Sequence, residues 1–178
     1  MFPASLQTNR LTLRPIALAD SGAIFETYAQ DFEVTRFLTW RPHPDRAATD
    51  AYIAHRIAVP TAISRTYVLI GRDDGVLRGA LDLRRPVPHR VELGYVLARH
   101  WWGQGLMTEV LTETVRWVFT QAGVFRAGAV CDVENIASAR VMEKAGLARE
   151  GVLRRWLVHP NLGDEPRDCV SYARVREP

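Results

Sequence analysis

Residues 92–109 of the chain read ELGYVLARHWWGQGLMTE, and this stretch decides the fold. Polarity alternates over its first part, which predicts a strand over Val91–Leu97. Apolar residues then recur at helical spacing, which predicts a helix over residues 106–122 that is stopped by Gly123. The turn between strand and helix contains Gly103 and Gly105. Such a junction presents free backbone N–H groups and the positive end of a helix dipole, so it predicts a site for a phosphate-bearing ligand.

Two glycines before a helix are a weak indication by themselves, since a tight turn alone can require both. A Rossmann dinucleotide site matches poorly, because Thr108 stands where the third glycine of that motif would be. A Walker A loop is excluded, because the chain has no Gly-Lys-Ser/Thr sequence. The chemistry of the turn therefore depends on the rest of the chain.

The segments before this stretch predict one strand, three helices and two further strands. Residues 10–15 alternate and predict a short edge strand that Pro15 stops. Helices are expected from Asp20 to about Tyr28, from Asp31 to about Phe37 and from Asp45 to Ala58. Strands are expected at 67–70 and 80–84. Short turns join these two to Val91–Leu97 and predict an antiparallel meander.

The segments after the long helix predict a strand over Ala127–Val133 and a helix over Ile136–Ala145 ended by Gly146. Two final strands are expected at Ala148–Val158 and Arg167–Val175. This order predicts an α/β (α+β) fold with a mixed, mostly antiparallel sheet of about seven strands and helices on both faces. The length of 178 residues predicts a single domain over 1–178.

Composition limits the class of protein and its compartment. No run of about 18 apolar residues occurs, and the N-terminal segment lacks the apolar core of a signal peptide, so neither a membrane span nor a leader is expected. Only two cysteines are present, which favours a reducing, cytoplasmic location. The net charge is +3, but the basic residues are dispersed, which disfavours nucleic-acid binding as the primary function. No histidine cluster has metal-ligand spacing, so no metal is expected.

Residues 92–97 and 101–109 together resemble the acyl-CoA motif of the GNAT superfamily of N-acyltransferases. Residues 135–147, followed by Glu150-Gly151, resemble a second segment of that family. The opening at residues 8–15, TNRLTLRP, is typical of the branch that contains ribosomal-protein N-terminal acetyltransferases. The resemblance covers nearly the whole chain. It implies a GNAT fold and transfer of an acetyl group from acetyl-CoA to a primary amine by direct attack in a ternary complex.

The resemblance also implies which residues hold the cofactor. The backbone of Tyr95, Val96 and Leu97 would pair with the pantetheine, and Asn135 would bind its amide. The pyrophosphate would be held by the N–H groups of Gly103, Gln104, Gly105, Leu106, Met107 and Thr108. Trp102 stands where the family has a Gln or Arg, so the backbone alone must hold the pyrophosphate.

Two side chains are candidates for catalysis, and each has a structural alternative. Glu92 could take the proton of the amine, or it could be the ion-pair partner of Arg84 or Arg90. By resemblance Ser138 lies near the sulfur and could give a proton to the leaving thiolate. Alternatively, Asn135 caps a helix whose third residue is Ser138.

Further expectations concern the nucleophile, the acceptor and the partners. Cys131 is expected to be an inert core residue, so no covalent intermediate is expected. By resemblance, the acceptor would be bound by segments around residues 36–41 and 156–167. A protein N-terminus, a polyamine and an antibiotic amine all remain open, as does a silent acyl-CoA-binding module. The late strands could also pair in a homodimer.

Overall fold

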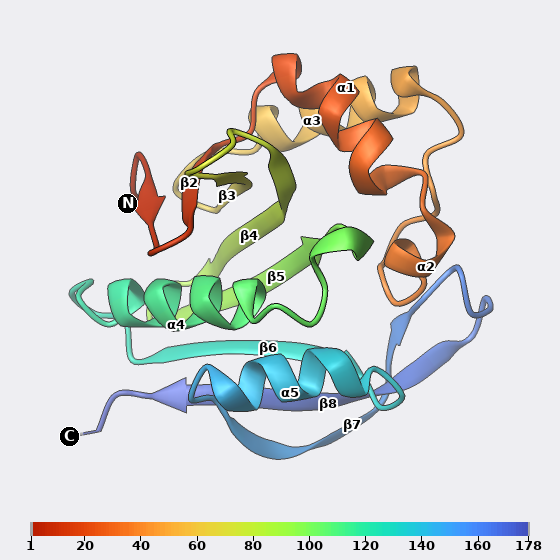
Figure 1. Ribbon diagram of the computed structural model, residues 1–178. Coiled ribbons are helices and arrows are strands. Elements are labelled where there is room, and N and C mark those ends of the chain that lie inside the picture. Colours follow the sequence, from red (N-terminus) through yellow and green to blue (C-terminus); the bar gives the residue numbers. More distant parts are fainter. Residues whose placement is uncertain (1, 178) are drawn as a thin grey trace.

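The computed structural model describes residues 2–177 and contains one eight-stranded sheet (Figure 1). The strand order is β1-β2-β3-β4-β5-β6-β8-β7, and every neighbouring pair is antiparallel except the parallel pair β5–β6. The strands are β1 Leu6–Gln7, β2 Leu11–Pro15, β3 Ser64–Gly71, β4 Leu77–Val87, β5 Arg90–Leu97, β6 Arg126–Asp132, β7 Ala148–Val158 and β8 Pro166–Val175. The predicted fold class is confirmed, with one strand more than expected.

Helices cover both faces of the sheet, as predicted. They are α1 Ser21–Ile24, α2 Phe32–Thr35, α3 Arg46–Ala58, α4 Leu106–Val118 and α5 Ile136–Lys144. One core lies between the sheet and α4 and α5, and it includes Leu69, Leu111 and Met142. A smaller core lies between the other face and α1 and α3, and it includes Val68 and Ile53. Since successive strand residues face opposite sides, β3 supplies both cores.

Three details differ from the sequence-based expectations. Residues 10–15 are not at the edge of the sheet, because β1 pairs with β2 through Leu6 and Leu13. Asp20 does not cap a helix through its side chain; its carboxylate accepts from Ala17 N–H and binds Arg14. Helix α4 ends at Val118 rather than at 122, because both the N–H and the hydroxyl of Thr120 bond to the carbonyl of Trp117 and tighten the chain into a turn.

The sheet opens between β5 and β6. These strands pair only where Arg90–Glu92 lies beside Arg126–Gly128. Beyond this point β5 stays paired with β4 as far as Leu97, and β6 stays paired with β8 as far as Asp132. The strands therefore diverge, and Figure 1 shows the gap widening toward the end of β5 that leads into α4.

Candidate active site

The backbone of β5 beyond Glu92 turns polar groups toward the opening. The carbonyl of His89 accepts from the N–H groups of Phe125 and Arg126, so it faces β6. The carbonyl of Leu97 accepts from the Trp102 indole N–H at 2.6 Å, so it also points away from β4. Because backbone groups alternate along a strand, those of Leu93, Tyr95 and Leu97 face the opening.

Val96 faces the other way. Its carbonyl points at β4, where a Cβ placed on Gly79 would lie only 2.2 Å from it. The Val96 side chain, by contrast, lines the cavity described below. Of the three residues expected to offer backbone groups, Tyr95 and Leu97 turn theirs toward the opening, whereas the backbone of Val96 faces β4.

The turn after β5 carries a run of free backbone donors. Gly103 and Gly105 both have φ of 74°, in the left-handed region that favours glycine. The first residue whose N–H closes the new helix is Glu109, which donates to the carbonyl of Gly105. Within residues 2–177, none of the six N–H groups from Gly103 to Thr108 has an acceptor. Six adjacent donors at the positive end of a helix form a site for an anion.

Arg10, the residue before β2, forms hydrogen bonds to this turn. Its Nε donates to Glu109 at 2.7 Å, and its Nη1 donates to the Gln104 carbonyl at 3.0 Å. Partial burial would raise the pKa of the Glu109 carboxyl, but hydrogen bonds from Thr8 and Arg10 and the charge of Arg10 lower it, so the carboxyl is ionised and balances the charge of Arg10. Sequence reasoning missed this role. The only signal available was an acidic residue in the first turn of a helix expected to bind an anion.

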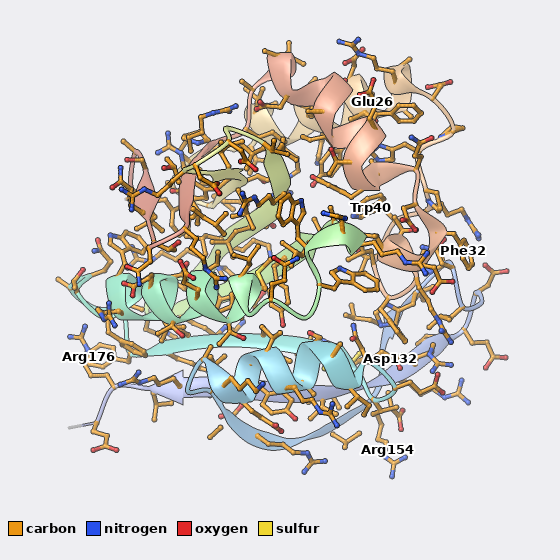
Figure 2. The ribbon with its side chains drawn as sticks, in the orientation of Figure 1. Glu26, Phe32, Trp40, Asp132, Arg154 and Arg176 are labelled. Atoms are coloured by element: carbon orange, nitrogen blue, oxygen red, sulfur yellow. The ribbon has the colours of Figure 1, made fainter. Side chains whose placement is uncertain are left out.

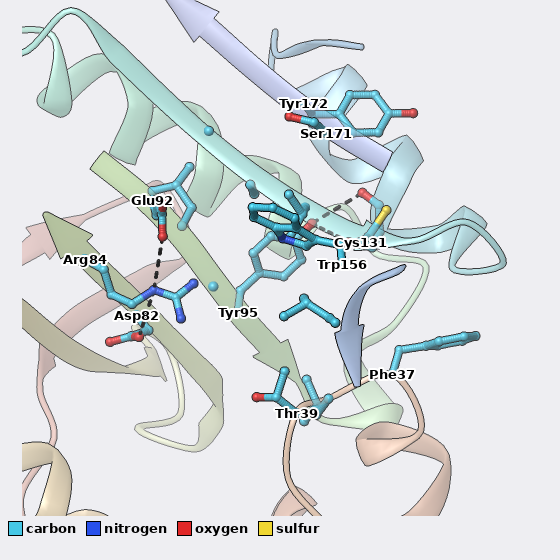
Figure 3. A pocket seen from close by; sticks show the side chains of 18 of the residues that line it. Phe37, Thr39, Asp82, Arg84, Glu92, Tyr95, Cys131, Trp156, Ser171 and Tyr172 are labelled. Atoms are coloured by element: carbon cyan, nitrogen blue, oxygen red, sulfur yellow. Dashed lines mark hydrogen bonds and ion pairs between the residues drawn. The ribbon is translucent and has the colours of Figure 1, made fainter. Parts of the chain in front are cut away.

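A cavity of about 1050 Å³ passes through the opening in the sheet. From the face of the smaller core it is lined by Asp82, Arg84 and Glu92, and from the other face by Tyr95 (Figure 3). Ser138 of α5 lines it as well. One space therefore reaches both faces, so two molecules can meet there from opposite sides. Glu92, Tyr95, Val96, Asn135 and Ser138 line it, whereas Leu97 and the glycine turn do not.

Tyr95 and Ser138 meet on the α5 side. Asn135 caps α5 by accepting from Ser138 N–H at 3.1 Å, which confirms the capping role that was considered for it. This leaves the Ser138 hydroxyl free to approach the Tyr95 hydroxyl at 2.7 Å. Burial raises the pKa of the Tyr95 phenol, so it stays protonated.

Cys131 lines the same part of the cavity as Ser138. Burial raises the pKa of its thiol to about 11. A neutral thiol is a poor nucleophile, which agrees with the expectation that Cys131 is inert.

The other side of the opening is a row of alternating charges on β4 and β5. Glu92 lies 3.2 Å from Arg90 Nη2 and 4.0 Å from Arg84 Nε. Arg84 Nε is also 3.8 Å from Asp82, which in turn binds Arg56. Both ion pairs considered for Glu92 therefore exist. The Glu92 side chain remains 39% exposed in the cavity, so an incoming amine can still reach it.

The two segments expected to bind the acceptor lie together at the mouth of the cavity. The Asn161 amide donates to the carbonyls of Thr35 and Trp40 and so ties the late loop to the segment after α2. Trp156 projects from a bulge in β7 where Arg155 has φ of 48°. The exposed Trp156 and the half-buried Phe37 both line the cavity (Figure 3).

Asp132 marks the end of β6 (Figure 2), where it accepts from Arg167 at 2.6 Å. No group of three or more acidic, cysteine or histidine side chains in residues 2–177 is arranged to hold a metal ion. None of the helices described is long and apolar enough to cross a membrane.

Comparison with known proteins identifies the family of the chain. Residues 10–148 match a family model described as an acetyltransferase (GNAT) domain. The chain is 30% identical to YoaA, an uncharacterised N-acetyltransferase of Bacillus subtilis, over 99% of this chain and 98% of that protein.

Solved structures share the fold. A putative acetyltransferase from T. thermophilus has a TM-score of 0.85 and 29% identity, covering 98% of this chain and 90% of that one. RimL, a ribosomal L7/L12 α-N-protein acetyltransferase in complex with coenzyme A, has a TM-score of 0.81 and 20% identity, covering 97% and 96%. The resemblance to the GNAT family that the sequence motifs suggested is confirmed.

Proposed function

The chain belongs to the GNAT acetyltransferase family, and on this premise we propose that it moves an acetyl group from acetyl-CoA to a primary amine by direct attack in a ternary complex. The observation that carries the proposal is the run of six free N–H groups from Gly103 to Thr108. These N–H groups begin a few residues after β5, the strand whose backbone faces the opening. One extended cofactor can therefore bind to both the strand and the turn.

The cofactor is placed by two sets of backbone groups. The pyrophosphate binds at the Gly103–Thr108 turn, with the charge of Arg10 nearby. The pantetheine lies in the opening, where the groups of Tyr95 and Leu97 pair with its amides, and it passes Asn135 at the start of α5. One N–H on this strand donates to the thioester oxygen and stabilises the oxyanion that develops there.

The chemistry needs one bond made, one bond broken and two proton movements. The neutral amine attacks the thioester carbon, the new C–N bond forms, and the C–S bond then breaks. Glu92 accepts the proton that the nitrogen loses, directly or through water. The Ser138 hydroxyl, backed by Tyr95, donates a hydrogen bond to the departing sulfur. Both hydroxyls are weak acids, so they act by stabilising the thiolate, which then takes a proton from water.

For the acceptor we propose a protein N-terminal α-amine, with a small-molecule amine as the alternative. The opening residues TNRLTLRP support the first, because they are typical of the branch that modifies ribosomal proteins. The cavity, with a volume of about 1050 Å³ and a lining that includes Phe37, Trp40 and Trp156, has room for either.

Initial-rate kinetics with acetyl-CoA test the mechanism. Release of CoA thiol should depend on both substrates, and reciprocal plots at several fixed amine concentrations should intersect. Peptides with free N-termini, compared with a panel of small amines, identify the acceptor class. Parallel lines, or an acetylated Cys131 found by mass spectrometry, would show a covalent route instead. CoA binding without turnover on any amine would identify a silent binding module.

A further inference from the structure

Four arginines line the cavity, and three of them, Arg56, Arg90 and Arg126, are bound to a carboxylate at hydrogen-bond distance. Arg56 donates to Thr66 at 2.9 Å and to Ser64 at 2.7 Å, and it also binds Asp82. Arg126 binds both carboxylate oxygens of Glu150 through its two terminal nitrogens. Arg90 Nη2 lies 3.2 Å from Glu92, so a carboxylate of the chain holds each of these three guanidinium groups at hydrogen-bond distance.

Arg84 is placed differently. Only its Nε lies near carboxylates, at 3.8 Å from Asp82 and 4.0 Å from Glu92, both beyond hydrogen-bond distance. Its terminal nitrogens have no acceptor among residues 2–177, and 49% of the side chain is exposed. Figure 3 shows the guanidinium between Asp82 and Glu92 and directed into the pocket.

Gly94 makes room for this guanidinium on β5. A Cβ placed on Gly94 would lie 3.6 Å from Arg84 Nη2, so a longer side chain there would displace the fork. Gly94 directly precedes Tyr95, and one strand residue spans about 3.4 Å. The terminal nitrogens of Arg84 therefore lie within roughly 7 Å, the length of about two strand residues, of the Tyr95 backbone, which is proposed to face the cofactor.

We propose that the acceptor amine carries an anionic group, a carboxylate or a phosphate, close to its amino nitrogen, and that Arg84 binds this group. This inference rests on the proposed acetyl transfer and names the substrate class of the same site. A guanidinium fork matches the paired oxygens of a carboxylate or phosphate. Each of the three carboxylates that line the cavity, Asp82, Glu92 and Glu150, already has an arginine partner, so the cavity holds no surplus of negative charge that would favour a polyamine.

The test uses matched pairs of amines that differ in one charge. The pairs are an α-amino acid and its carboxamide, a peptide amide beginning Ser-Asp and one beginning Ser-Asn, and phosphoethanolamine and ethanolamine. We expect wild type to favour the anionic member of at least one pair by about tenfold or more in kcat/KM, and the pair concerned distinguishes carboxylate from phosphate. Arg84→Gln should remove most of that preference, because kcat/KM should fall much further for the anionic member than for the neutral one, and KM for acetyl-CoA should change by less than about threefold.

Two further variants control for charge and for folding. Arg84→Lys keeps the charge without the fork and should retain part of the preference. Arg126→Gln removes a cavity arginine that is closed by Glu150, so it should leave the preference unchanged. Binding of each amine to the enzyme–CoA complex, measured by calorimetry, gives the same comparison without turnover.

The possible outcomes separate this inference from the proposed function. If no anionic amine is bound or acetylated better than its neutral partner, or if Arg84→Gln weakens both members equally, the inference is wrong. Turnover on neutral amines alone would leave acetyl transfer standing while overturning the role of Arg84. Arg84-dependent binding of anions without any acetyl transfer would support the inference and overturn the function.

Discussion

The two sides of the opening between β5 and β6 are built from different parts of the chain. On the α4 side the candidate ligands are backbone N–H groups of consecutive residues, Gly103 to Thr108. On the acceptor side they are side chains from separate strands, such as Arg84 and Glu92, whose positions depend on ion pairs. A site made of backbone is fixed by a local glycine pattern. A site made of side chains is fixed only when the fold brings its strands together.

The largest effect on activity is expected from a substitution on the acceptor side. In Glu92→Gln we expect kcat at pH 7 to fall by about 10²- to 10⁴-fold, the usual contribution of a general base, with KM for acetyl-CoA little changed. The loss should shrink as pH rises, because more of the amine is then neutral. It should also be smaller for an α-amine, with a pKa of about 7.7 to 8.0, than for a lysine-type amine at about 10.4. The measurement is the pH–rate profile of both proteins.

Glu150→Gln is the matched control for this variant. Glu150 is a carboxylate of similar exposure in the same cavity, but Arg126 and Ser171 occupy its oxygens. Its replacement should leave kcat within about threefold of wild type, well below a general-base contribution. If Glu92→Gln behaved in the same way, Glu92 would be only an ion-pair partner of Arg84 and Arg90.

The next largest effect is expected from a substitution on the cofactor side. Gly105 has φ of 74°, where a β-branched residue is strained, so Gly105→Val should tilt the N–H groups of the turn. We expect KM for acetyl-CoA to rise by about 100-fold, since hydrogen bonds to charged groups contribute about 1.5 to 3 kcal/mol each.

Gly123→Val is the control for backbone strain. Gly123 has φ of 73° and no neighbour within 4 Å of an added Cβ, and it lies beyond the other end of α4. It should lose similar stability without a change in KM. Tight CoA binding by Gly105→Val would show that the pyrophosphate binds elsewhere.

The smallest effect is expected from substitutions of the two hydroxyl residues that lie between the cofactor side and the acceptor side. Tyr95→Phe and Ser138→Ala should each lower kcat by about tenfold, the effect of losing one hydrogen bond to a charged sulfur. The double variant should be little worse than either, because the two hydroxyls share one hydrogen bond.

The pH dependence of this pair has a defined sign. Burial raises the pKa of the Tyr95 phenol, so its donor form persists to higher pH than that of a free tyrosine at about 10. No loss of rate from Tyr95 ionisation is therefore expected below about pH 10. A fall in rate between about pH 8 and 9 that disappears in Tyr95→Phe would contradict this assignment.

The sequence predicted most of the fold because its strands and helices have clear periodicities. The meander before α4 followed from an apolar run at 67–70, from alternation at 80–84 and 91–97, and from the short turns between them. The late β7–β8 pair followed from two segments that flank a loop rich in Pro, Asn and Gly. The position of β2 was missed because β1 has only two residues, too few for a pattern. The early end of α4 was missed because apolar residues continue in register beyond Val118 while Thr120 turns the backbone.

The candidate site could be predicted only in part. The glycine turn was visible in residues 103–108, and the alternation of β5 placed Glu92 on the strand face opposite Tyr95. The hydroxyl pair of Tyr95 and Ser138 was not visible, because it joins residues 43 positions apart across two elements. The same holds for Arg10 and Glu109, which are 99 positions apart. Contacts of this range depend on tertiary packing and leave no local pattern.

The opening in the sheet also bears on how the protein stays apart from other chains. Unpaired strand edges normally invite pairing with a foreign strand and so promote aggregation. Here the two exposed edges belong to interior strands, face each other for only a few residues, and are covered on one face by α4 and α5. A slot of only a few residues leaves a foreign strand little length to pair with, but its two edges present backbone groups that a slender ligand with amide groups can bind. The same opening therefore serves ligand binding while limiting the length of strand edge that could promote aggregation.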